Sequence, residues 1–173
     1  MTSLLCKLRR VLDALYTVAG GLAAVCLFAL LLLIVAQMGA RAAGINFPGS
    51  TDYAGYLMAA SSFLAFAYTL NRGGHVRVSL LIGRLTGSAR YVAELLCHTL
   101  ALIMTSILAW YAVTMVYWSY ELGDVSQGQD ASPLWIVQSP LAIGAVILAI
   151  CFLDNLVSLL VRKQDNIAAD IVG

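Results

Sequence analysis

Charged residues are scarce in this chain. They make up 11% of its 173 residues, whereas 61% are hydrophobic. Ordinary soluble domains are roughly 25% charged. A soluble chain of this length has no core large enough to bury so much apolar surface, so the lipid bilayer is the predicted solvent. The sequence therefore predicts an all-α integral membrane protein.

Residues that carry catalysis or hold cofactors are also few. The four cysteines form no Cys-x-x-Cys pair, which argues against a disulfide-exchange enzyme. A haem-binding helical subunit normally needs two facing intramembrane histidines, and of the two histidines present only His98 is suitably placed, since His75 falls in a loop. The sequence contains no Walker loop, zincin motif, nucleophile elbow or basic face with interleaved aromatic residues. We therefore expect no enzyme, no metal or cofactor site and no nucleic-acid partner.

Four apolar segments are long enough to span a bilayer, which takes about 20 residues. These predicted spans are residues 12–43, 53–70, 91–120 and 140–161 of one membrane domain, 1–173. A cleaved signal peptide is the weaker interpretation of the first segment, because the apolar run is too long and lacks a small-residue cleavage site. Pro140 either begins the fourth helix or kinks a longer one that starts near Ser132.

The basic residues are distributed unevenly between the predicted loops. Nine of the ten lysines and arginines precede span one, lie between spans two and three, or follow span four. The opposite side holds one basic and four acidic residues: Arg41, Asp52, Glu121, Asp124 and Asp130. Lysine and arginine in short loops mark the cytoplasmic side. The sequence therefore predicts that both termini and the 71–90 loop are cytoplasmic.

Small residues indicate where helices approach one another. Helices in lipid associate through such residues, because hydrophobicity does not drive one apolar helix onto another. Gly20 and Gly21 predict a close approach on span one, and span two interleaves many small residues with aromatic ones. Leucines alternate with charges in residues 1–16, and apolar residues do so in 76–85, which predicts interfacial amphipathic segments. Residues 1–16 also fit a frayed end whose charges only set topology.

Ionisable residues within membrane spans are candidates for function. Glu94 and His98 are four residues apart and share one face of the third helix, near Arg90. Their closeness to the cytoplasmic interface favours a paired structural role over a metal or proton site. Asp154 lies about two turns from Arg162, where pairing is favoured over binding of a coupling ion.

The loop after span two carries a distinctive run of residues, Asn71-Arg72-Gly73-Gly74-His75-Val76-Arg77-Val78. Arg77 and Arg84 would share one face of a short interfacial helix. There they would meet lipid phosphates or acidic groups of a partner, or else only fix topology by snorkelling.

Two stretches of the sequence, on this architecture, resemble the small membrane subunit of tripartite ATP-independent periplasmic (TRAP) transporters, the DctQ-like family. The first runs from Asp52 through the small and aromatic residues of span two to the Arg72–Val78 run. The second is Ser132-Pro133-Leu134-Trp135 followed by Ser139-Pro140-Leu141-Ala142-Ile143-Gly144. Many members carry Asp where Ser79 stands, so any charge pairing there does not transfer.

The resemblance implies a partner rather than a reaction. Such subunits join a large multi-span subunit that binds substrate and coupling sodium ions, and a periplasmic binding protein delivers the substrate, often an organic acid. The expected function is an accessory scaffold subunit of the bacterial inner membrane that braces the transport subunit and helps to dock the binding protein. The expected subunit or lipid contacts are Arg72, Gly73, Gly74, His75, Arg77 and Arg84.

Two other functions stay open on the sequence. A small self-assembling secondary transporter would use Glu94 or Asp154 as its coupling site. A haem-anchoring respiratory subunit would use His98, although it lacks a second well-placed histidine.

Overall fold

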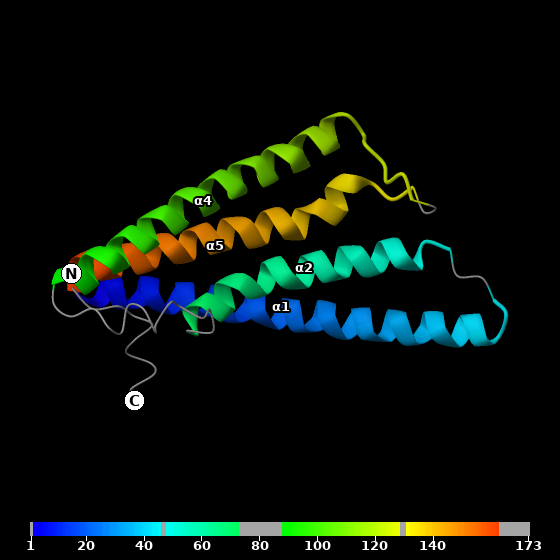
Figure 1. The fold of residues 1–173 in the computed structure, drawn as a ribbon, viewed down its shortest axis with the longest axis horizontal. Coiled ribbons are helices and arrows are strands. Elements are labelled where there is room, and N and C mark those ends of the chain that lie inside the picture. The colour runs from blue at the N-terminus through cyan, green and yellow to red at the C-terminus, as the bar shows by residue number, and fades with distance from the viewer. Residues whose placement is uncertain (1, 46–47, 73–87, 129–130, 163–173) are drawn as a thin grey trace.

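The computed structural model describes residues 2–45, 48–72, 88–128 and 131–162. These residues form four helices: α1 (Thr2–Ala42), α2 (Ser50–Asn71), α4 (Ser88–Glu121) and α5 (Leu134–Arg162). Figure 1 shows the helices as long rods that run roughly along the long axis of the molecule, with α4 inclined to α1. The predicted all-α membrane fold is confirmed.

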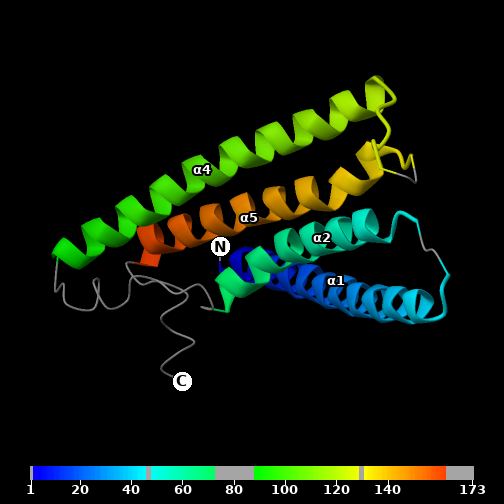
Figure 2. The same cartoon turned by 45° about the vertical axis from the view of Figure 1, so that its right-hand side comes forward.

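The helices lie side by side in an open layer. Among the described residues, the extensively packed pairs are α1 with α2, α2 with α5 and α5 with α4. Figures 1 and 2 both show the resulting order across the layer, with α4 at one edge and α1 at the other. α2 and α5 therefore lie in the middle of the layer and α1 and α4 at its edges, and α1 also reaches α5 at Tyr16.

Three of the helices are long and apolar enough to cross a membrane. These candidate spans are Arg9–Ala42, Arg90–Glu121 and Leu134–Leu160. α2 is not among them, because tyrosine, serine, threonine and glycine interrupt its apolar residues. Its place between α1 and α5 shields much of that polar character from lipid. That the second segment also spans the membrane stays a prediction.

One helix start differs from the sequence prediction, and another decides between two alternatives. α1 continues without a break through residues 2–16, so the amphipathic stretch is not a separate helix that turns into the first span. α5 begins at Leu134 with Pro140 inside it, which agrees with the longer of the two predicted helices. The hydroxyl of Ser139 donates to the carbonyl of Ile136 at 2.8 Å. That carbonyl is the one that would normally accept from the missing N–H of Pro140, so the neighbouring serine supplies the lost donor.

Two clusters of buried side chains hold the layer together. The first joins α1, α2 and α5 and consists of Tyr16, Ala19, Ala67, Leu70, Ile147, Leu148 and Cys151. The second joins α4 to α5 and consists of Ala109, Ala112, Ala142 and Ala145, with Phe63 of α2 packed against it. Alanine dominates the second cluster, which lets the helix backbones come close, as expected for packing in lipid.

Glycine allows the closest helix approaches. A Cβ atom added at Gly144 of α5 would lie 2.6 Å from the backbone carbonyl carbon and oxygen of Phe63 on α2. At Gly20 of α1 an added Cβ would lie 2.7 Å from the ring of Tyr68 on α2, whereas at Gly21 nothing lies within 4 Å. The predicted close approach on α1 is therefore confirmed at Gly20 and wrong at Gly21.

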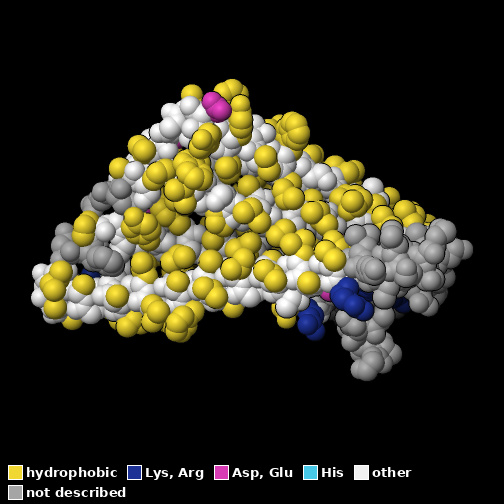
Figure 3. All heavy atoms as spheres, turned by 180° about the vertical axis from the view of Figure 1, so that it is seen from behind, with side chains coloured by type: hydrophobic (Ala, Val, Ile, Leu, Met, Phe, Trp, Pro, Cys, Tyr) yellow, Lys and Arg dark blue, Asp and Glu magenta, His cyan; other side chains and the backbone are white. Residues whose placement is uncertain are grey.

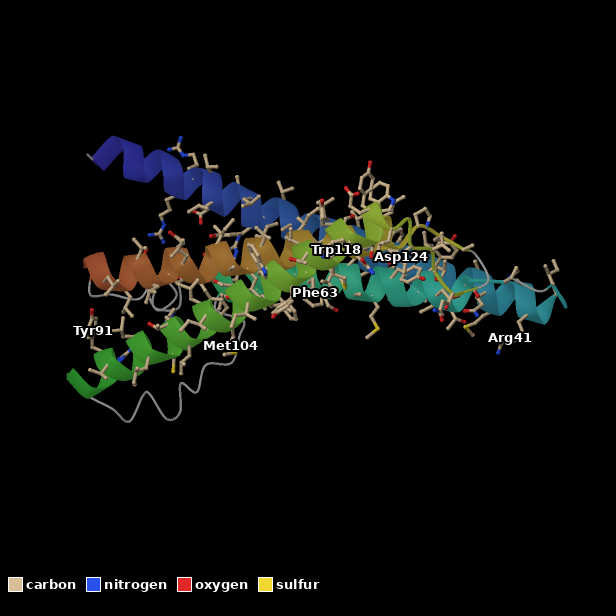
Figure 4. All side chains as sticks on the ribbon, turned by 90° about the horizontal axis from the view of Figure 1, so that it is seen from above. Arg41, Phe63, Tyr91, Met104, Trp118 and Asp124 are labelled. Atoms are coloured by element: carbon tan, nitrogen blue, oxygen red, sulfur yellow. The ribbon has the colours of Figure 1, made fainter. Side chains whose placement is uncertain are left out.

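Charges collect at the two ends of the layer. Successive helices run in opposite directions, so the starts of α1 and α4 lie with the ends of α2 and α5; we call this the basic end. The arginines at this end are Arg9, Arg10, Arg72 and Arg90, together with Arg162, the last residue of α5. The opposite, acidic end holds Arg41, Asp52, Glu121 and Asp124. Figure 3 shows hydrophobic side chains over most of the face in view, with basic side chains together at one end. Figure 4 shows Tyr91 and Arg41 at opposite ends of the layer.

Candidate functional site

The predicted contact loop is described only at its first residue. Arg72 follows the last turn of α2, where its backbone N–H donates to the carbonyl of Tyr68 at 3.0 Å. Its exposed guanidinium lies 5.5 Å from the ring centroid of Tyr68, a cation–π arrangement. Tyr68 is the side chain that packs over Gly20, so Arg72 is linked to the seam between α1 and α2. The other predicted contacts, Gly73, Gly74, His75, Arg77 and Arg84, lie outside the described residues.

Glu94 and His98 are buried together on α4. Nε of Arg90 donates to Oε1 of Glu94 at 2.9 Å, which forms an ion pair between residues one helical turn apart. Nδ1 of His98 donates to the backbone carbonyl of Glu94 at 2.9 Å. The structure thus brings the two residues together as their spacing predicts, and α4 itself supplies a partner to each. This geometry suits a structural pairing, while the role of the pair stays a prediction.

Asp154 lies half-buried on α5, beside a buried polar group of residues. It is close enough to Tyr16 and Cys151 to interact with both electrostatically. Nδ2 of Asn155 donates to the carbonyl of Cys151 at 2.9 Å, and the Cys151 thiol lies 3.8 Å from the carbonyl oxygen of Ala67 on α2. Within the described residues, no group of three or more His, Cys, Asp and Glu side chains could hold a metal ion.

Tyr16 was not singled out from the sequence, yet it is the most completely buried large side chain of α1. None of its surface is exposed, and its hydroxyl faces the Cys151 thiol, a weak acceptor, without a hydrogen bond of ordinary geometry to any described residue. A tyrosine at the amphipathic start of a helix gives no sequence signal of such burial. Only the convergence of α1, α2 and α5 produces it.

The connection between α4 and α5 is tied to α2 at the acidic end. The hydroxyl of Tyr56 shares a hydrogen bond of 2.7 Å with Ser126, and that of Tyr53 shares one of 3.3 Å with Ser132. The backbone N–H of Ser126 donates to the carbonyl of Ser132 at 2.8 Å, which closes the connection on itself. We call residues 122–128 and 131–133, with these two tyrosine bonds, the clasp. The sequence did not predict the clasp, because a tyrosine near the end of a predicted span is equally typical of an anchor at the membrane interface.

Aromatic residues surround the clasp and mark this end of the layer. The rings of Tyr120 and Trp135 meet edge to face at 5.6 Å, and those of Tyr117 and Trp118 do so at 5.7 Å. Figure 4 shows Trp118 and Asp124 toward the same end as Arg41. Such an arrangement is typical of an aromatic belt at a membrane interface.

These features define an all-α integral membrane protein whose described residues form helix seams, a local ion pair and the clasp. Residues 30–162 match the family model for the DctQ component of tripartite ATP-independent periplasmic transporters. The chain belongs to this family, which is the small component of TRAP transporters and a transporter-component family rather than an enzyme family. No curated protein matches the chain.

Proposed function

We propose that this chain is the accessory scaffold subunit of a TRAP-type secondary transporter. It braces the large membrane subunit, which moves an organic-acid-type substrate together with sodium ions, and it contributes to docking of the periplasmic binding protein. It lies in the bacterial inner membrane with both termini in the cytoplasm, as the distribution of basic residues favours.

The open layer of helices is the observation that carries this proposal. Among the described residues, the interior where α1, α2 and α5 meet is filled by buried side chains, so the layer does not by itself surround a path for a polar substrate. It can instead lie along the wall of a larger subunit. α1 and α4 at its edges expose long runs of large apolar side chains. The tight seams at Gly20 and Gly144 and the clasp make the layer stiff, which suits a brace.

A small self-assembling transporter is the alternative function, with Glu94 or Asp154 as the coupling site. The carboxylate of Glu94 is engaged by Arg90 at 2.9 Å, which favours a structural role for this carboxylate. The alternative predicts that the purified chain alone, in liposomes with a sodium gradient, takes up a radiolabelled organic acid. It also predicts that either Glu94→Gln or Asp154→Asn abolishes this uptake. Our proposal expects no uptake by the chain alone.

The proposed bracing role is tested by adding the chain back to its partners. The large subunit and the binding protein are reconstituted with and without this chain, and sodium-driven uptake of the organic acid that the binding protein captures is measured. We expect uptake only when this chain is present. Equal uptake without it would defeat the proposal.

The contact loop is tested in the same reconstitution. Replacing Arg72 and Arg77 by Ala should weaken assembly or uptake, because both residues are predicted to contact lipid or partner at the basic end. Arg41→Ala, at the acidic end, is the matched loss of charge and should have little effect. Unchanged assembly and uptake in the Arg72 and Arg77 variants would show that the loop is not a contact site for the partner or for lipid.

A further inference from the structure

Two polar aromatic side chains on α4 are exposed where lipid alone would leave them without hydrogen-bond partners. Trp110 is 73% exposed and Tyr111 is 68% exposed. Among the described residues, neither the indole N–H nor the phenol O–H of this pair makes a hydrogen bond. Trp and Tyr favour the interfaces of a membrane, because there the ring is in lipid and the polar group reaches water.

The depth of these residues follows from the charges that bound α4. Glu94 and Glu121 are the acidic residues near its two ends, and the residue midway between them falls at 107–108. At 1.5 Å per residue, Trp110 and Tyr111 lie about 4 to 5 Å from that midpoint, and a hydrocarbon core about 30 Å thick would extend about 10 Å beyond them. The packing agrees, because Ala109 and Ala112 meet Ala142 and Ala145, which lie near the middle of the α5 span.

The direction of the helix keeps these side chains from reaching the nearer interface. Side chains on a helix tilt toward its N-terminus. The N-terminus of α4 lies at the basic end, whereas Trp110 and Tyr111 lie nearer to the acidic end. The tilt therefore points both side chains toward the middle of the membrane. Snorkelling, which explains many polar aromatics near helix ends, does not explain this pair.

The other edge of the layer lacks this feature. The large hydrophobic side chains that are exposed on α1 are all valine, leucine, isoleucine, phenylalanine or methionine. Phe28 lies one residue from the midpoint between Asp13 and Arg41, close to the middle of α1, and it is 62% exposed. Lipid tails satisfy such a surface completely. The two edges thus differ in chemistry, and only α4 carries hydrogen-bonding aromatics at mid-depth.

We propose that the exposed face of α4 around Trp110 and Tyr111 is the surface on which the large membrane subunit docks. A helix of that subunit supplies hydrogen-bond acceptors to the indole N–H and the phenol O–H, and the α1 edge faces lipid. Met104 and Trp118, seven residues on either side of Tyr111, lie on the same side of α4 and extend this face along the helix. The inference rests on the proposed function, in which the chain assembles with that subunit.

Photocrosslinking in the intact complex tests which edge meets the partner. The photoreactive amino acid p-benzoylphenylalanine is placed at position 111 and, as the matched control, at position 28. We expect the large subunit to be crosslinked from position 111 and only lipid from position 28. Crosslinks from position 111 to lipid or to a second copy of this chain, or from position 28 to the large subunit, would overturn the inference.

Removing only the polar groups gives a second test. A partner-facing α4 predicts lower recovery of the large subunit, whereas a lipid-facing α4 predicts equal or higher recovery. The variants are Trp110→Phe and Tyr111→Phe, which keep an aromatic ring at each position. The tagged chain is purified at limiting concentration, and the amount of large subunit recovered with it is measured. Interhelical hydrogen bonds in membranes are worth enough to change association about threefold each, so we expect about a ninefold loss for the double variant. Tyr117→Phe, in the belt where headgroups and water supply partners, should change nothing.

The two possible failures are distinguishable. Undiminished or increased recovery with the double variant, while the unchanged chain recovers the large subunit, would overturn the docking surface alone, since it is the result expected of a lipid-facing edge. Failure of the unchanged chain to recover any large subunit would overturn the proposed function and this inference with it.

Discussion

The seam between α2 and α5 should be the most sensitive point of the layer to a single added methyl group. Gly144→Ala would place a Cβ atom 2.6 Å from the backbone carbonyl of Phe63, whereas ordinary contact begins at 3.4 Å. The shortfall is about 0.8 Å, and it is against backbone, which cannot rotate away as a side chain does. α5 must therefore move off α2, and Phe63 then also separates from the alanine cluster between α4 and α5.

The expected cost is that of overpacking, about 1 to 3 kcal/mol in the free energy of unfolding. The matched control is Gly21→Ala on α1, where an added Cβ meets nothing within 4 Å. Gly20→Ala should fall between the two, because the atom in the way belongs to the Tyr68 side chain. The assay is unfolding of the purified protein in mild detergent, followed by tryptophan fluorescence. Equal stability of the Gly144→Ala and Gly21→Ala variants would refute the reasoning.

Three further predictions concern hydroxyl groups. Ser139→Ala should lower the free energy of unfolding by about 0.5 to 1.5 kcal/mol in the same assay. The loss should be much smaller in a Pro140→Ala background, where the backbone N–H is restored, and additive effects of the two substitutions would contradict this. Tyr56→Phe breaks the 2.7 Å bond to Ser126 and should speed hydrogen exchange in the clasp, with no change if the loop holds its shape without it. Tyr16→Phe should leave stability equal or higher, because it removes a buried hydroxyl that is poorly satisfied beside the weakly accepting Cys151 thiol. Tyr16→Ala should instead cost about 3 to 5 kcal/mol, and similar losses in both variants would contradict the poorly satisfied state.

The helices themselves could be predicted from the sequence, because in lipid a backbone must satisfy its own hydrogen bonds. Uninterrupted apolar runs therefore locate α1, α4 and α5, and the predicted bounds lie within three residues of the observed ones for α4 and for the ends of α1 and α5. The starts of α1 and α5 were predicted less well. Pro140 fitted either a first helical residue or a position inside a longer helix, and the Ser139 hydroxyl that replaces its missing donor could be recognised only once the helix was seen to begin at Leu134.

Contacts between helices were predicted less well, since they depend on which faces meet. Gly20 and Gly21 were equivalent in the sequence, and only the rotation of α1 against α2 separates them. Gly144 appeared only as part of a resemblance, yet it is the residue that lets α5 approach the backbone of α2. Glu94 and His98 were correctly placed on one face, because a four-residue spacing needs no tertiary information. The roles of these two residues and of the 73–87 loop stay predictions.

The composition of the native complex tests the bracing role most directly. The tagged chain is purified from its own host in a gentle detergent, and the intact assembly is weighed by native mass spectrometry. We predict one large transport subunit for each copy of this chain, with the binding protein joining when its substrate is present. The chain recovered alone or as a homo-oligomer, and able to drive uptake in liposomes, would contradict the account and return Glu94 and Asp154 to the centre of the mechanism.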